Sequence, residues 1–187
     1  MKKSKNIALF GKSSAGKDTI QKWIVSKYPD IKSITSCTTR PKRDYEQDDI
    51  DYHFLTTEQF TNKVLNGEML EATEFRGWFY GTSIDSLDED RLNIGSFNPA
   101  GIDAILKDSR LDVLPIYVSA PDKIRLLRSL QREKNPDCHE ICRRFFADIE
   151  DFQIIDDFNY SVVYNNTNDD TVFYQVENEI VNYFDQV

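Results

Sequence analysis

Apolar positions along this chain follow two kinds of pattern, short continuous runs and the wider spacing of amphipathic helices. The first run, residues 7–10, has the length of one buried strand. Apolar residues then recur at helical spacing, at Ile20, Trp23, Ile24 and Tyr28, and Pro29 ends this pattern. The first part of the chain is therefore predicted to form a strand, a glycine loop and a helix.

The same patterns continue along the rest of the chain. Strands are predicted at residues 32–37, 51–55, 69–75, 92–97, 113–119 and 160–164. Helices are predicted at residues 57–65, 98–105, 121–132 and 139–152, with a last one that Asp169 and Asp170 open. Thr57 is the predicted N-cap of the first of these helices. Because strands and helices alternate on both sides of a strand-rich middle block, we predict an α/β fold with a β-rich insertion.

The loop after the first strand has the spacing G-x-x-x-x-G-K, ending at Lys17. Glycines lack a Cβ atom, so the backbone N–H groups of such a loop can turn inward around a polyphosphate. The helix N-terminus adds partial positive charge, and Lys17 supplies a full charge for the outer phosphates. The predicted phosphate-binding residues are Gly11, Ser13, Ser14, Ala15, Gly16, Lys17, Asp18 and Thr19.

One residue of this loop departs from the usual motif. The motif has a Ser or Thr after the lysine, where its hydroxyl ligates magnesium, but Asp18 stands there. The Asp18 carboxylate could ligate the metal directly, ligate it through water, or point away as an N-terminal helix charge. Thr19 could take over part of the hydroxyl's role. We therefore expect Mg²⁺ as the cofactor, with Asp18 as the candidate ligand.

Composition narrows the class of protein. The chain has 187 residues, 40% of them hydrophobic, which suits one domain with a real core. Its net charge of -9 argues against a nucleic-acid surface. No apolar stretch approaches the roughly 20 residues of a membrane span, and no secretory leader is expected. Three cysteines without a C-x-x-C pattern argue against disulfides and for a reducing, cytoplasmic compartment.

Cations gather after the predicted second strand. Arg40 and Arg43 flank Pro41, which stiffens the backbone and suits two guanidinium groups aimed at one phosphate. The acidic residues that follow, within residues 44–51, are predicted to form a solvated loop.

Two further groups of arginines lie on predicted helices. Arg125, Arg128 and Arg132 share one helix face, and Arg143 and Arg144 lie on the next helix. Because the two groups lie on either side of a helix break in a chain with a phosphate loop, we expect them to belong to a closing lid.

Taken in order, these features resemble the guanylate kinase family of P-loop nucleoside monophosphate kinases. The resemblance covers nearly the whole chain and rests on residues 11–17, 36–43, 46, 51–52, 71, 77 and 80–82. It implies a three-layer P-loop kinase fold with a parallel five-stranded core sheet, a β-rich insertion for the monophosphate and a helical lid. One guanylate kinase-like domain, residues 1–187, would have its core in residues 1–35, 84–130 and 155–187. The acceptor-binding region would be residues 36–83, and the lid about 131–154.

The resemblance also implies a reaction, the ATP-dependent phosphorylation of GMP or dGMP. Arg40, Arg43, Tyr52 and Tyr80 would hold the acceptor phosphate. Ser36, Glu71 and Thr82 would read guanine, with Asn98 facing the acceptor base. Arg128 would contact the ATP donor, and Asn165 or its neighbour Asn166 would contact the donor base. Lys17, Arg40, Arg43, Arg132 and Arg144 would be the catalytic residues. Glu71 makes chemical sense, because guanine offers an N1–H and a 2-amino group that one carboxylate can accept together.

Departures from the family keep two alternatives open. Ser96 and Asn98 stand where the family usually carries acidic residues. With Asp18, they also resemble the ribose 1,5-bisphosphate phosphokinases, whose acceptor is a sugar phosphate. The other alternative is a guanylate kinase-like binding module that has lost catalysis. The expected partners are the small nucleotides ATP and GMP or dGMP, without nucleic acid or membrane, acting on a monomer or homodimer.

Overall fold

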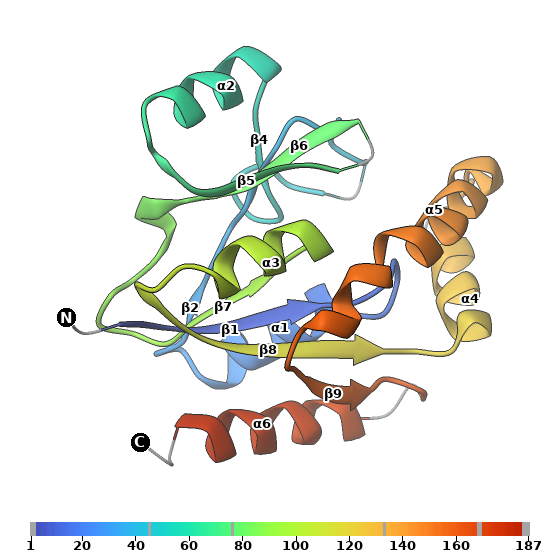
Figure 1. The fold of residues 1–187 in the computed structure, drawn as a ribbon. Helices are drawn as coiled ribbons and strands as arrows, with labels where there is room; N and C mark the ends of the chain where they lie inside the picture. Colours follow the sequence, from blue (N-terminus) through green and yellow to red (C-terminus); the bar gives the residue numbers. More distant parts are fainter. Residues whose placement is uncertain (1–2, 45, 76, 133, 168–169, 185–187) are drawn as a thin grey trace.

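The computed structural model describes residues 3–44, 46–75, 77–132, 134–167 and 170–184. Its core is a five-stranded sheet in the order β2-β7-β1-β8-β9, and all of its strand pairs are parallel (Figure 1). The strands are β1 (Ser4–Phe10), β2 (Lys32–Ser33), β7 (Asn93–Ser96), β8 (Leu111–Ser119) and β9 (Ser161–Tyr164). The prediction of a parallel five-stranded core sheet is confirmed.

Helices cover both faces of this sheet. α1 (Lys17–Lys27) and α6 (Thr171–Phe184) pack on one face. α3 (Pro99–Leu106) and the turn η2 (Gln153–Asp157) pack on the other. The central strand β1 contributes to both cores, because its side chains alternate between the two faces. This burial on both faces explains why its sequence is a continuous apolar run rather than an alternating one.

A second, four-stranded sheet has the order β4-β3-β6-β5. Its strands are β3 (Cys37–Thr38), β4 (His53–Phe54), β5 (Met69–Phe75) and β6 (Trp78–Ser83). α2 (Thr57–Leu65) packs beside it, and α3 lies between this sheet and the core sheet (Figure 1). The β-rich middle block of the sequence therefore forms a sheet of its own.

Two helices stand at the carboxyl ends of the core strands. α4 (Asp122–Arg132) follows β8, and α5 (Cys138–Asp151) returns toward the core (Figure 1). In parallel sheets this end is where ligands bind. The fold therefore places the loop after β1, the two helices and the second sheet around one region.

The prediction of a single strand over residues 32–37 is wrong. Lys32–Ser33 pairs with β7 in the core sheet, whereas Cys37–Thr38 pairs with β4 and β6 in the second sheet. Ile34 still donates its N–H to the carbonyl of Ile94 at 2.8 Å, and after it the chain leaves the core. A strand-like pattern does not reveal this change of sheet, because the side-chain period is the same in both.

The predicted N-cap of α2 is also wrong, by one residue. The Thr56 side chain accepts the N–H of Gln59 at 3.2 Å, and Gln59 Oε1 accepts the N–H of Thr56 at 2.8 Å. This reciprocal arrangement is a capping box, so Thr57 is the first helical residue. Asp169, which was expected to open the last helix, lies outside the described residues.

At the outer edge of β9, a side chain of α6 pairs with the last residue of the strand. Gln175 Oε1 accepts the N–H of Tyr164 at 2.9 Å, and Gln175 Nε2 donates to the carbonyl of Tyr164 at 3.3 Å. Both backbone polar groups of the last residue of the strand are therefore satisfied without another strand.

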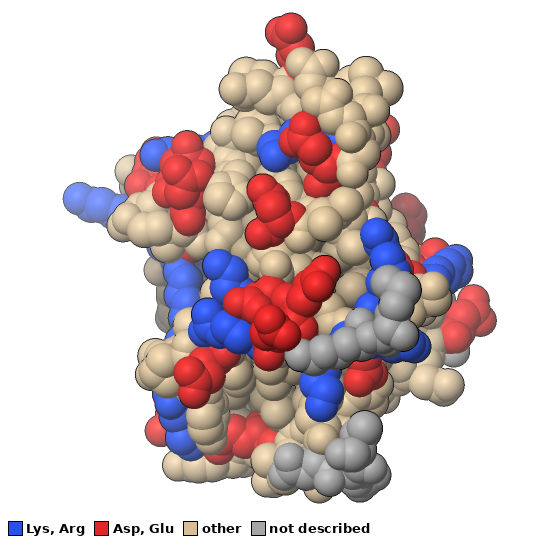
Figure 2. All heavy atoms as spheres, turned by 90° about the vertical axis from the view of Figure 1, so that its left-hand side faces the viewer, with Lys and Arg blue, Asp and Glu red and all other residues tan. Residues whose placement is uncertain are grey.

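The surface carries both signs of charge. Figure 2 shows acidic side chains gathered near the middle of one face, with basic side chains on either side of them. Among the helices of the described ranges, none combines the length and the apolar character needed to cross a membrane.

Candidate functional site

A cavity of about 860 Å³ opens at the carboxyl ends of the core strands. The predicted site residues that line it are Gly11, Ser13, Ser14, Gly16, Lys17, Asp18, Thr19, Ser36, Arg40, Arg43, Tyr52, Glu71, Tyr80, Asn98, Arg132 and Arg144. Arg128 and Asn165 line a neighbouring cavity of about 500 Å³, which also contacts Gly16. The phosphate loop and the arginine pair, which the sequence could only place in separate segments, therefore face the same space.

Close packing explains why the loop needs its two glycines. Gly11 has a φ of 156°, and a Cβ there would lie 2.5 Å from the carbonyl oxygen of Val118 in β8. Gly16 has a φ of 101°, and a Cβ there would lie 2.3 Å from Asn165 Nδ2. A side chain at either position would be strained; at Gly11 it would push the loop away from β8, and at Gly16 it would displace the Asn165 side chain.

Side chains from α4 and from Asn165, the residue after β9, hold the loop from outside. Asn165 Nδ2 donates to the carbonyl of Ala15 at 2.8 Å, and Arg128 Nη2 donates to Asn165 Oδ1 at 3.0 Å. Arg132 Nη2 donates to Ser14 Oγ at 2.8 Å. The predicted donor-side arginines and Asn165 thus converge on the loop, although Ala15 itself is buried.

The lysine and aspartate that follow the loop lie at its mouth. Lys17 Nζ donates to the carbonyl of Gly11 at 2.7 Å, so the ammonium group spans the loop. Asp18 and Thr19 are exposed in the first turn of α1 and line the cavity. The Asp18 carboxylate therefore lies where a cation on the loop's phosphates could reach it.

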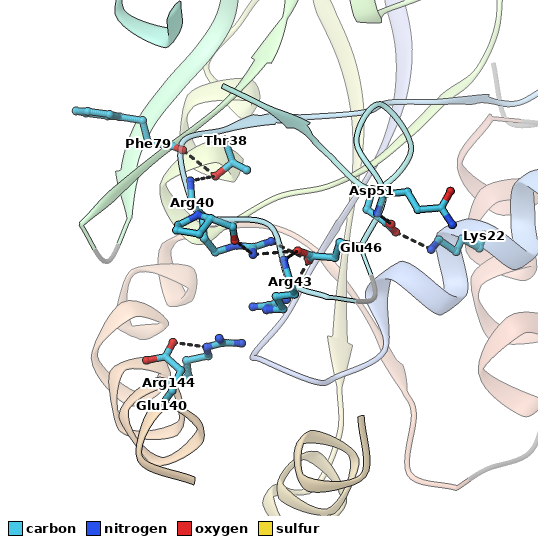
Figure 3. Close-up of polar contacts among 11 residues, drawn as sticks. Lys22, Thr38, Arg40, Arg43, Glu46, Asp51, Phe79, Glu140 and Arg144 are labelled. Carbon is cyan, nitrogen blue, oxygen red and sulfur yellow. Dashed lines mark hydrogen bonds and ion pairs between the residues drawn. The ribbon is translucent and has the colours of Figure 1, made fainter. Parts of the chain in front are cut away.

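The expectation that residues 44–51 form a solvated loop is wrong for Glu46. Glu46 is 7% exposed and accepts from Arg40 Nη1 and Nη2 at 3.0 and 2.8 Å (Figure 3). Arg43 donates to the same carboxylate from its backbone N–H at 2.9 Å and from Nη1 at 3.1 Å. Burial opposes ionisation, but these hydrogen bonds outweigh it and lower the pKa of Glu46. One anion thus fixes both arginines and leaves the group with net positive charge.

Two tyrosines, Tyr52 and Tyr80, line the cavity beside this arginine pair. The centroids of the Tyr52 and Tyr80 rings are 6.3 Å apart, and the Arg40 guanidinium lies 5.5 Å from the centroid of Tyr52. Burial, followed by the nearby charge of Asp18, raises the pKa of Tyr52. Tyr52, Tyr80 and Arg40 thus lie together in the wall of the cavity that the phosphate loop also lines.

Glu71 is a buried carboxylate in the wall of the cavity. It is 8% exposed and accepts the Thr82 hydroxyl at 2.9 Å. Burial raises the pKa of Glu71 to about 7, although the hydrogen bonds from Thr82 oppose the shift. Thr82 is fully buried and acts on the cavity only through Glu71, whereas Ser36 lines the cavity directly.

Neutral polar groups occupy the end of β7, where acidic residues were expected from the family. Ser96 Oγ donates to Gln21 Oε1 at 3.0 Å, and Gln21 Nε2 donates to Ser33 Oγ at 3.0 Å. Asn98 caps α3 by accepting the N–H of Gly101 at 2.7 Å, and its Nδ2 donates to Thr73 at 3.0 Å. The sequence did not single out Gln21, because a lone glutamine on a helix carries no motif.

α5 brings further arginines over the cavity. Glu140 accepts from Arg143 Nε and Arg144 Nε, each at 2.6 Å, and these bonds lower the pKa of Glu140 to about 2. Figure 3 shows the Arg144 guanidinium directed from α5 toward Arg43 across the cavity. The predicted lid arginine therefore faces the predicted acceptor arginine.

Asp148 of α5 is a site residue that sequence reasoning missed. It is 1% exposed, lines the cavity and binds both Ser13 of the phosphate loop and Arg125 of α4. Arg125 is buried as well, so it does not extend the lid face predicted for Arg128 and Arg132. In the part of the chain that the structure describes, no cluster of three or more His, Cys, Asp or Glu side chains could hold a metal.

A parallel sheet with a glycine-rich phosphate loop after its central strand, facing a second cationic site on a β-rich insertion, defines a P-loop nucleotide-binding protein of the kinase type. The guanylate kinase family model matches residues 3–181. With that match, the chain belongs to the guanylate kinase family.

Individual relatives agree with this assignment. The guanylate kinase of Thermotoga maritima is 34% identical over 172 residues, which cover 89% of this chain and 82% of that protein. The guanylate kinase of Clostridium perfringens strain SM101 is 31% identical over 167 residues, covering 87% and 77%. The crystal structure of guanylate kinase from Anaplasma phagocytophilum has a TM-score of 0.70 at 20% identity, covering 98% of this chain and 88% of that one, and supports the fold.

Proposed function

We propose that this protein transfers the terminal phosphoryl group of ATP to GMP or dGMP. The observation that carries the proposal is that the phosphate loop, the Arg40–Arg43 pair and the buried Glu71 carboxylate line one cavity. Two cationic sites in one space can bring a donor phosphate and an acceptor phosphate together. The guanylate kinases among its relatives support the same reaction.

On the donor side, the phosphate loop and Lys17 would bind the phosphates of ATP. Arg128 and Asn165 line the adjoining cavity beyond Gly16, and they would contact the rest of the donor. Arg132 and Arg144 would neutralise charge on the phosphoryl group during transfer. The positions of these side chains and the resemblance to the family support these proposed roles.

On the acceptor side, Arg40 and Arg43 would orient the acceptor phosphate, with Tyr52 and Tyr80 completing its site. Glu71 would accept the N1–H and the 2-amino group of guanine, with Ser36 and Asn98 nearby and Thr82 holding Glu71 in place. The catalytic contribution would be positioning and neutralisation of charge rather than covalent chemistry. No general base is required, because the acceptor phosphate is already an anion.

Guanylate kinase chemistry implies Mg²⁺, and the carboxylate beside the phosphate loop is a suitable ligand for this ion. Mg²⁺ in phosphate sites is held by one or two carboxylates, waters and the phosphates themselves. Asp18 supplies one carboxylate at the mouth of the loop. The end of β7 supplies no second carboxylate, because Ser96 stands there. Bound there, the ion would screen the charge of the ATP phosphates, and Asp18 would hold it directly or through water.

The division of the chain also belongs to this proposal. Residues 36–83 would bind the acceptor, residues of about 131–154 would act as the lid, and the remainder would form the core. Closing the lid would exclude water, which otherwise would hydrolyse ATP. We further propose a reducing, cytoplasmic setting, from the three free cysteines, and a monomer or homodimer that acts on small nucleotides rather than nucleic acid or membranes.

A coupled assay of ADP release, run with GMP, dGMP, AMP, UMP and ribose 1,5-bisphosphate as acceptors, tests the proposal. We expect turnover with GMP or dGMP and little with the others. Turnover with the ribose bisphosphate but not with GMP would establish the sugar-phosphate kinase alternative. No turnover with any acceptor, together with intact ATP binding, would establish a non-catalytic module. The comparisons favour neither alternative.

A further inference from the structure

A buried ion pair joins α4, α5 and the phosphate loop. Arg125 Nη1 donates to Asp148 Oδ2 at 2.8 Å, and their side chains are only 3% and 2% exposed. Asp148 also accepts the backbone N–H of Ser13 at 2.9 Å and its hydroxyl at 3.2 Å. Arg125 Nη1 donates in addition to the Ser13 carbonyl at 3.1 Å. The pair therefore binds both backbone polar groups of one loop residue, as well as its side chain.

The surroundings of the pair fix its geometry. Arg125 Nη2 donates to Asp122 at 2.8 Å, and the Arg125 guanidinium lies 4.9 Å from the centroid of the Phe145 ring. Charge-assisted hydrogen bonds in such a low-dielectric setting are short and directional. Buried ion pairs add little net stability, because the cost of desolvation offsets the attraction. What this pair provides is therefore a defined arrangement of three segments.

That arrangement reaches the reacting groups through α5. Arg144 precedes Asp148 by one helical turn, so both side chains lie on the same face of the helix. Both line the cavity. Anchoring Asp148 to Ser13 therefore holds this face of α5, and Arg144 on it, at a defined distance from the phosphate loop.

We propose that Asp148, held by Arg125, is a positioning residue for phosphoryl transfer. It fixes the phosphate loop at Ser13 and, through α5, fixes the reach of Arg144 over the donor phosphates. The inference rests on the proposed function, since it assigns no reaction of its own.

Asp148→Asn tests this role, because asparagine keeps the shape of the side chain and removes its charge. We expect the affinity for a non-hydrolysable ATP analogue, measured by calorimetry, to fall by about 10- to 100-fold, and kcat to fall with it. The KM for GMP should stay within about twofold of the wild type, since the contacts of the pair described above go to α4, α5 and the phosphate loop. Glu150→Gln, which removes an exposed carboxylate from the same helix, is the matched control and should behave as the wild type.

A second variant separates positioning from stability. Asp148→Asn combined with Arg125→Met removes both charges, so no unpaired charge stays buried and the melting temperature should recover toward that of the wild type. We expect analogue affinity and kcat to remain low in this folded protein. Recovery of both along with stability, or an Asp148→Asn variant with unchanged or tighter analogue binding, overturns the proposal. A wild-type protein that binds the analogue but does not phosphorylate GMP contradicts the proposed function instead, because the analogue titration needs no acceptor.

Discussion

Replacing Lys17 should have the most direct effect on turnover. Its ammonium group spans the phosphate loop, 2.7 Å from the carbonyl of Gly11, and it would meet the outer phosphates of ATP. Lys17→Ala should abolish ADP release while leaving the circular dichroism spectrum and the melting temperature nearly unchanged. Lys12→Ala is a fair control, because Lys12 belongs to the same loop but not to the lining of the cavity. Unchanged turnover in Lys17→Ala would contradict the donor-site assignment.

Glu71 should link stability and binding to pH. Burial raises its pKa in the folded protein to about 7, above the ordinary value of 4.5. The folded state therefore holds this proton more tightly than the unfolded state does. Its contribution to the free energy of unfolding is complete below about pH 4.5 and is lost as the pH rises through 7, a change on the order of 3 kcal/mol. Guanine needs the ionised carboxylate, so GMP affinity should rise between about pH 6 and 8.

Glu71→Gln removes that titration and gives a direct comparison. The variant should be more stable than the wild type at about pH 8, and its preference for GMP over AMP should fall by about 1–3 kcal/mol. Chemical denaturation at two pH values and kcat/KM for both acceptors measure these effects. Glu74→Gln changes an exposed position on the same strand and should alter neither quantity. Intact selectivity in Glu71→Gln would mean that Glu71 does not read the base.

Single residues were predictable where a motif assigns them and not where only the fold does. Lys17 and the pair Arg40 and Arg43 could be identified from the sequence, because their spacing carries chemistry. Asp148 could not, since its partner Ser13 is 135 residues away. The pairing of Glu46 with Arg40 and Arg43 could not be predicted either, because several acidic residues follow the two arginines and only the fold selects Glu46.

Among the elements, α2 offers a clear test of a boundary. Thr56 forms the capping box with Gln59, whereas Thr57, the cap that the sequence predicted, lies inside the helix. Thr56→Ala should lower the free energy of unfolding by about 1 kcal/mol, because it leaves helix N–H groups without a partner. Thr57→Ala should change it by much less. Urea denaturation of the two variants decides between the caps, and equal losses would argue against the capping box.

Long, strongly patterned elements could be predicted well. Four elements are present close to their predicted positions: the strands β1 and β5 and the helices α2 and α5. The short strand β4 lies inside the strand predicted at residues 51–55. The short strand β3 could not be separated from β2, because two residues carry no period. Their pairing is decided by the second sheet, which the local sequence does not describe.

At the scale of the whole molecule, the two cationic sites should act together. Because one cavity contains both, a compound that joins adenosine and guanosine through a chain of phosphates should occupy them at once. Linking the two ligands makes the second contact intramolecular, so its affinity should exceed that of either nucleotide by about 100-fold or more. Calorimetric titration against ATP and GMP alone provides the comparison. An affinity no better than that of ATP would mean that the sites do not face each other.

The overall architecture followed from the order of the motifs rather than from any one of them. The glycine loop, the arginine pair and the buried glutamate lie far apart along the chain, and their order is that of the family. How closely they approach could not be obtained from the sequence. The influence of Asp18 on Tyr52 and the direction of Arg144 both depend on how α5 and the second sheet sit against the core.

The glutamine that covers β9 has a consequence for how copies of this protein can meet. A sheet normally grows by strand addition, in which a neighbouring chain docks onto the unpaired amide and carbonyl groups of an edge. At Tyr164 both groups are already occupied by Gln175. At the opposite edge, β2 offers only two residues to an incoming strand. Strand addition to the core sheet is thus blocked at Tyr164, and at the other edge an incoming strand would find only the two residues of β2 to pair with.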